Sequence, residues 1–236
     1  MKKLRSHMIL CLFTLLAVAG CASTQVTSRD EVVTGKLPRP GHIWVYQFVA
    51  TSSDVPADSR LAGQHSQHPT PQTAEQIAAG RKVGAEIAGN LVQQILAMGL
   101  PAVLASTQTK PQLNDIVLKG YLLSIDEGSA EKRIAIGFGS GTSDLKAAVE
   151  GFQMTAHGLR KLGGGTLDSS GSKGPGEAAS LGMAIATGNP IGLIVSTGAK
   201  IYGEESGKSK VEGRADQTAK EIADVLRKRF QEQGWI

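Results

Sequence analysis

Residues 115–126 read DIVLKGYLLSID, and the apolar run inside them predicts a β-strand. A second strand is predicted upstream, over 101–106. Both segments are short and rich in Leu, Ile and Val, which is typical of strands in a sheet. The centre of the chain is therefore expected to form the sheet of the domain.

Downstream, residues 140–157 alternate partly between apolar and polar side chains. The face of the predicted strand changes at Gly151, and a one-residue change of face at a glycine is what a β-bulge produces. A hairpin through Gly158 to a further strand near 162–167 completes this part of the sheet. Upstream, the β-branched and aromatic residues of 42–51, HIWVYQFVAT, predict the first strand. The proline-rich stretch 52–72 predicts a surface loop.

Two helices are predicted, one between the first strand and the strand over 101–106, and one at the C-terminal end of the chain. Thr73 and Gln76 have the spacing of a capping box, and helical periodicity continues to about residue 98. Small residues such as Gly84 on this helix predict close packing against the sheet. Apolar residues from Ala215 to Phe230 recur at helical spacing and predict an amphipathic helix that ends near Gly234. The expected fold is α+β, one sheet of about five strands with helices packed on it, preceded by a signal peptide and flexible tether.

The first 20 residues have the features of an export signal. Lys2, Lys3 and Arg5 precede an apolar run from Met8 to about Ala19, which is shorter than the roughly 20 residues that a bilayer-spanning helix needs. We therefore expect residues 1–20 to be removed as a lipoprotein signal peptide.

The signal ends in Val18-Ala19-Gly20-Cys21, which resembles a bacterial lipobox. The resemblance implies that Cys21 carries lipid and anchors the protein; the alternative is ordinary signal cleavage beside a chance cysteine. Three acyl chains would make the attachment effectively permanent. Ala22, in place of the Asp that resembles an inner-membrane retention signal, favours the periplasmic face of the outer membrane.

Polar residues and prolines without periodicity predict a flexible tether over 21–41. The remainder, 42–236, is expected to form a single α+β domain. Without residues 1–20 the chain has 22 Lys and Arg against 21 Asp and Glu, a net charge of +1. This near-neutral charge and the 4% aromatic content argue against nucleic acid as a partner. Loss of Cys11 and lipidation of Cys21 leave no cysteine for a disulfide.

The sequence contains several weak candidates for chemistry. The glycine-rich segment 137–141, GFGSG, indicates a turn or bulge more than a phosphate site, because it lacks the residues of a P-loop. His65 and His68 lie near Asp54 and Asp58, but a third metal ligand is not indicated by spacing. His42 and His157 are expected in strands. No GxSxG motif is present, so we expect no enzyme, no cofactor and no metal site.

Residues 177–203, EAASLGMAIATGNPIGLIVSTGAKIYG, form a glycine-rich apolar segment around Pro190. Each half is too short for a spanning helix. One interpretation is a buried hairpin or helix pair with close backbone packing; the other is contact with the membrane or with a second copy of the chain.

A family resemblance rests on four motifs: Asp126-Glu127-Gly128, Lys132-Arg133-Ile134, the run from Ile136 to Gly141 with Ser143, and the terminal Gln233-Gly234-Trp235-Ile236. Residues 42–236 resemble the proteobacterial lipoproteins grouped as domain of unknown function 4410. The resemblance implies fold and location but no activity and no catalytic residues. We therefore expect an outer-membrane-anchored, non-enzymatic binding or assembly module with an envelope protein partner or self-association. The alternative is a membrane-active homo-oligomer that uses 177–203.

Overall fold

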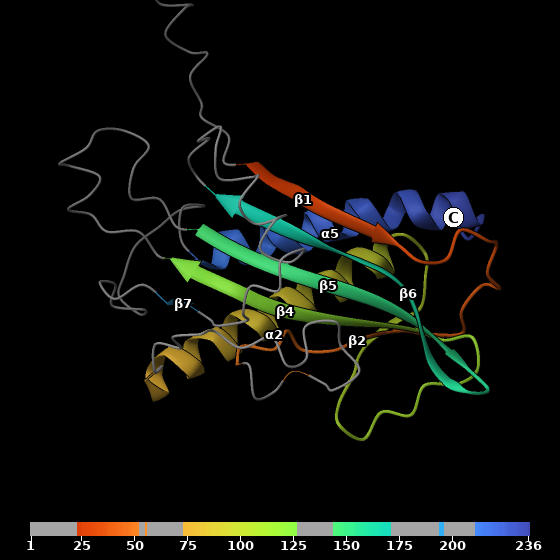
Figure 1. The fold of residues 1–236 in the computed structure, drawn as a ribbon, viewed down its shortest axis with the longest axis horizontal. Helices are drawn as coiled ribbons and strands as arrows, with labels where there is room; N and C mark the ends of the chain where they lie inside the picture. Colours follow the sequence, from red (N-terminus) through yellow and green to blue (C-terminus); the bar gives the residue numbers. More distant parts are fainter. Residues whose placement is uncertain (1–22, 52–54, 56–72, 127–143, 171–193, 196–210) are drawn as a thin grey trace, which may run out of the picture.

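The computed structural model describes residues 23–51, 55, 73–126, 144–170, 194–195 and 211–236. Its elements are β1 (Ser23–Glu31), β2 (Ile43–Val45), α2 (Ala74–Ala97), β3 (Ala102–Leu104), β4 (Ile116–Asp126), β5 (Asp144–Thr155), β6 (Gly158–Ser170), β7 (Ile194–Val195) and α5 (Val211–Gln233). The strands form one mixed sheet in the order β1-β6-β5-β4-β2-β3, and β7 pairs with β4. Both helices cover the same face of the sheet (Figure 1). The predicted α+β class is confirmed.

The sheet is antiparallel from β1 to β4, and parallel where β2 lies between β4 and β3. The strands predicted over 101–106 and 115–126 are β3 and β4. The expected bulge is present, because the pairing of β5 with β6 shifts register between Gly151 and Phe152. The hairpin turns at Gly158, whose φ of +102° favours glycine.

The helices match their predicted bounds within a few residues. Thr73 and Gln76 form the capping box of α2, and each side chain accepts from the backbone N–H of the other residue. Gly234 ends α5 with a φ of +75°. Buried apolar side chains of both helices and of β2, β4, β5 and β6 form one core, which includes Ile87, Leu91, Leu118, Leu122, Leu145, Ala219 and Phe230.

The strand predicted over 42–51 is only partly regular. Its first part is β2, and beyond Val45 the chain keeps separate backbone hydrogen bonds to β4, such as Val49 N–H to the Gly120 carbonyl at 2.8 Å. The irregularity lets Phe48 enter the core beside two glycines. A β-carbon on Gly84 would lie 2.3 Å from the Phe48 carbonyl oxygen, and one on Gly120 would lie 2.4 Å from the Phe48 ring. This confirms close packing of α2 at Gly84.

Strand β1 lies in the segment 21–41, where a flexible tether was expected. Residues from Ser23 to Glu31 pair antiparallel with β6, and Ser23 is the register partner of Ser170. The polar sequence of β1 conceals this role because an edge strand is held mainly by backbone hydrogen bonds. Ser23, the first described residue, thus already belongs to a paired strand.

The residues after β1 are also held in place, by the C-terminal end of α5. The Leu37 N–H donates to Gln233 Oε1 at 2.6 Å, and Gln233 Nε2 donates to the Gly35 carbonyl at 3.1 Å. Trp235 Nε1 donates to the Leu37 carbonyl at 3.2 Å. The described chain therefore folds as one unit from residue 23. Neither of its two long helices is apolar enough over a sufficient length to cross a bilayer.

Candidate binding pocket

Most of the residues that sequence analysis singled out lie outside the described part of the chain. These are Cys21, His65, His68, Asp54, Asp58 and the segment 137–141. The apolar segment 177–203 is described only at Ile194 and Val195, whose backbone pairs with Ser124 and Ile125 of β4.

Both histidines expected in strands lie just outside them. His42 precedes β2, its side chain is 49% exposed, and its ring lies 5.3 Å from that of Trp44. His157 is exposed in the turn between β5 and β6. The His42 Nδ1 lies 3.9 Å from Asp115 Oδ1, which is beyond hydrogen-bond distance. Within the described chain no three His, Cys, Asp or Glu side chains gather as metal ligands.

Asp115 is a buried carboxylate that sequence analysis missed. Its Oδ1 accepts from the His42 N–H at 2.9 Å, and its Oδ2 accepts from Trp44 Nε1 and the Gln112 N–H, both at 2.8 Å. These bonds fasten the start of β2 to the start of β4. Because both oxygens are occupied by neutral donors, we assign Asp115 a structural role.

A second polar cluster lies on the sheet between β4, β5 and β6. Glu150 is 4% exposed, accepts from the Tyr121 hydroxyl at 2.9 Å, and forms an ion pair with Lys161. Lys146 and Asp168 pair at 3.5 Å nearby. Buried charges persist when they are paired and hydrogen-bonded, and these pairs join neighbouring strands. The arrangement stabilises the sheet, although Asp168 Oδ1 is buried without a hydrogen-bond partner.

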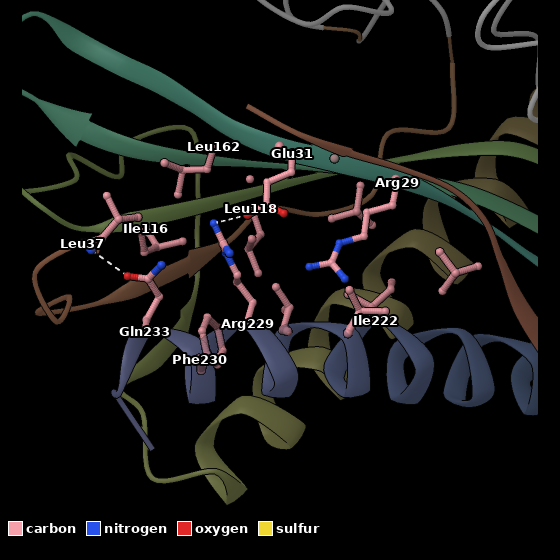
Figure 2. A pocket seen from close by; sticks show the side chains of 18 of the residues that line it. Arg29, Glu31, Leu37, Ile116, Leu118, Leu162, Ile222, Arg229, Phe230 and Gln233 are labelled. Carbon is pink, nitrogen blue, oxygen red and sulfur yellow. Dashed lines mark hydrogen bonds and ion pairs between the residues drawn. The ribbon is translucent and has the colours of Figure 1, made fainter. Parts of the chain in front are cut away.

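An apolar pocket of about 150 Å³ lies between α5 and the sheet, at the side where β1 is the edge strand (Figure 2). Helix α5 contributes one wall with side chains that include Ile222, Val225 and Leu226. The opposite wall comes from β1, β4, β5 and β6, and residues 37 and 235 close one end. The pocket is lined by Val26, Arg29, Glu31, Leu37, Ile116, Leu118, Val149, Gly151, Leu162, Gly163, Gly164, Gly165, Leu167, Ile222, Val225, Leu226, Arg229, Phe230, Gln233 and Trp235.

A run of glycines creates the space. Gly163, Gly164 and Gly165 of β6 pair with Gly151, Glu150 and Val149 of β5. Glycine inside a strand leaves room for a ligand or another backbone to approach closely. These glycines therefore leave space beside α5 between the side chains of Leu162 and Leu167, which also line the pocket from β6. This triplet was the signal in the sequence that would have indicated the pocket.

Charged groups stand at the rim of the pocket. Arg229 Nη2 of α5 pairs with Glu31 Oε1 at 2.5 Å and also donates to the Val33 carbonyl at 2.5 Å. Arg229 Nη1 pairs with Glu232 at 3.0 Å. Figure 2 shows Arg29 reaching from β1 toward α5, where it lines the same pocket. The site thus combines an apolar interior with a rim of mixed charge, in which Arg229 is paired with Glu31 and Glu232.

Comparison with known proteins identifies the class of the chain. A family model described as a domain of unknown function (DUF4410) matches residues 43–188, so the chain belongs to this family. No curated protein matches the sequence. Two solved structures are similar in part, both dodecamers of PelC from Paraburkholderia phytofirmans. One is a substituted variant with 13% identity and a TM-score of 0.32, the other has 11% and 0.34, and each alignment covers 68% of this chain and 92% of that one.

Proposed function

We propose that this protein is a lipoprotein of the outer membrane, held by lipid on Cys21 at the periplasmic face, and that it is a non-enzymatic binding module for an envelope protein. The apolar pocket between α5 and β6 carries this proposal. It is the feature of the described chain in which a side chain of a partner would bury apolar surface.

The size of the pocket sets the kind of group that it takes. An apolar cavity of about 150 Å³ accommodates a benzene-sized group, and this pocket, which is partly open to solvent, has a similar volume. This corresponds to one aromatic or branched aliphatic side chain, and a whole acyl chain is longer. Burying such a side chain contributes about 1.5–3 kcal/mol, as much as a typical interface anchor residue supplies.

The edge of the sheet supports a protein partner over a free small molecule. Strand β1 stands at the end of the strand order, so one side of its backbone has no neighbouring strand in the described sheet. An extended segment of another protein can add to such an edge and place alternate side chains in a nearby pocket. The Arg29 guanidinium at the rim favours a carboxylate close to the anchor side chain.

The anchor is supported by the sequence pattern at 18–21 and by the basic and apolar regions before it. The non-enzymatic role is supported by the polar clusters described above, in which Asp115, Glu150 and Asp168 are committed to structural bonds or ion pairs. A membrane-active oligomer that uses 177–203 stays a prediction from sequence.

The test is affinity isolation of the intact, lipidated protein after crosslinking in cells. Val225→Trp fills the pocket, because Val225 lines it from α5. Lys228→Trp is the matched control on an exposed position of the same helix. We expect that the wild type and Lys228→Trp both recover a specific envelope protein. Val225→Trp should reduce the amount recovered at least about tenfold, since 1.4 kcal/mol of lost binding free energy is a factor of ten in affinity. Equal recovery from both variants would remove the pocket from the proposal.

A further inference from the structure

Only Ala22 lies between Cys21, the proposed site of the lipid, and the first residue of β1, and this short connection limits where the membrane can lie. Ser23 is the first residue of β1, and Cys21 precedes it by two residues. A chain spans at most about 3.3–3.6 Å per residue, so the Cα atoms of these residues are within about 7 Å. A tether of 20 residues would instead allow the domain an average distance of about 25 Å from the anchor.

The start of β1 is paired with β6 and so does not act as a flexible tether. Its register with β6 continues from Ser23 to Glu31. Beyond Glu31, the N–H groups of Val32 and Val33 both donate to the Leu162 carbonyl, at 3.0 and 3.2 Å. The pair of Arg229 and Glu31 ties the far end of the strand to α5. The anchored end of the chain is therefore continuous with the folded domain.

Several strand ends lie at the same end of the sheet as Ser23. Antiparallel pairing puts Ser170 of β6 opposite Ser23, Leu145 of β5 opposite Ser169, and Asp126 of β4 opposite Asp144. Figure 1 shows the starts of β1 and β5 and the ends of β4 and β6 together, with the β5–β6 turn and the C-terminus at the other end. One end of the sheet is thereby distinguished from the other by its proximity to Cys21.

We infer that the lipid on Cys21 holds the domain directly against the bilayer surface, with the Ser23–Ser170 end of the sheet toward the lipid headgroups. This inference rests on the proposed lipidation of Cys21. The β5–β6 turn at His157 then points away from the membrane. Strand β6 has 13 residues, which at about 3.3 Å per residue gives a length of about 40 Å between the two ends.

The orientation has three consequences. The pocket is lined by β1 from Val26 to Glu31 and reaches Leu37 and Trp235 near the C-terminal end of α5, so most of it lies away from the membrane-facing end of the sheet. A partner segment that adds to β1 would run along the strand toward or away from the bilayer. The segments that follow Asp126 and Ser170 also start on the membrane side.

Energy transfer to the membrane surface tests this orientation. Under the proposal the mature protein has no free thiol, so Ser170→Cys and His157→Cys each create a single labelling site. The lipidated protein is labelled with a fluorescent donor and reconstituted into vesicles of phosphatidylethanolamine and phosphatidylglycerol with an acceptor on some headgroups. A separation of about 40 Å predicts transfer efficiency at least about twofold higher from residue 170 than from residue 157.

A spacer variant provides the matched control. Insertion of about 20 Gly and Ser residues between Ala22 and Ser23 restores a reach of about 25 Å and should remove most of the difference. Equal transfer from the two positions without the spacer, in protein whose acylation is verified by mass, would overturn the orientation alone. Absence of acyl groups on Cys21 would overturn the proposed function, and this inference with it.

Discussion

Gly84 of α2 lies so close to Phe48 that a β-carbon on this glycine would be 2.3 Å from the Phe48 carbonyl oxygen. The Phe48 N–H donates to the Gly84 carbonyl at 3.3 Å, so the helix and the chain after β2 are in backbone contact. The contact lets the Phe48 ring reach Gly120 of β4. It fixes how closely α2 approaches the sheet.

Gly84→Ala should destabilise the domain. The new methyl group meets rigid backbone, and overpacking of this kind costs about 1–3 kcal/mol, more than the helix propensity gained. Gly89 of the same helix is the control, because a β-carbon on it would have no other atom within 4 Å. Gly89→Ala should stabilise by about 0.5–1 kcal/mol. Urea unfolding of the non-lipidated chain from residue 22 measures both, and changes of the same sign would contradict the packing.

Asp115→Asn should weaken the junction of β2 with β4. An amide has one accepting oxygen, so when it keeps the His42 N–H the donors of Trp44 and Gln112 lose their acceptor. An orphaned donor costs about 1–3 kcal/mol when it is fully buried, and because these two are only partly buried we expect a total loss of about 2 kcal/mol. Trp44→Phe removes one donor and keeps a ring, and should cost about 1 kcal/mol. If Asp115→Asn has the same urea midpoint of unfolding as the wild type, the Asp115 carboxylate does not stabilise the junction of β2 with β4.

Phe230→Ala should lower the free energy of unfolding by about 3–5 kcal/mol, as large core truncations do. The Phe230 ring is 3% exposed and stacks on Trp235 at 5.4 Å, next to the pocket. Lys228→Ala on the exposed side of α5 should change stability by less than about 0.5 kcal/mol. An unchanged melting temperature of the Phe230 variant would show that the end of α5 is peripheral to the core.

The elements that sequence analysis predicted share a local signal. The Thr73 capping box, the helical spacing of Ala215 to Phe230, and the change of face at Gly151 each arise from interactions within a few residues, and the structure contains all three. The alternating faces of β5 likewise follow from burial of one side of the sheet. Such features can be predicted because they depend on residues that are only a few positions apart, whose relative placement follows from the geometry of the helix or strand.

The features that sequence analysis missed depend on partners far along the chain. Strand β1 has no apolar alternation, since its place at the edge is set by backbone pairing with β6, more than 130 residues away. The pocket arises where the Gly163–Gly165 stretch of β6 lies opposite α5; the triplet is visible in the sequence, but its position opposite α5 is not. The sequence around Asp115 indicates only the start of a strand. Its structural role depends on the hydrogen bond from Trp44, which is distant in the sequence.

The central claim is the lipid on Cys21, on which both the function and the orientation depend. The most direct measurement is the mass of the N-terminal peptide of the protein purified from the cell envelope. We predict a peptide that begins at Cys21 and carries acyl groups, and we predict that Cys21→Ala incorporates no palmitate analogue and leaves the membrane fraction. A mature chain that begins elsewhere, an unmodified Cys21, or palmitate label that persists on the alanine variant would contradict the account.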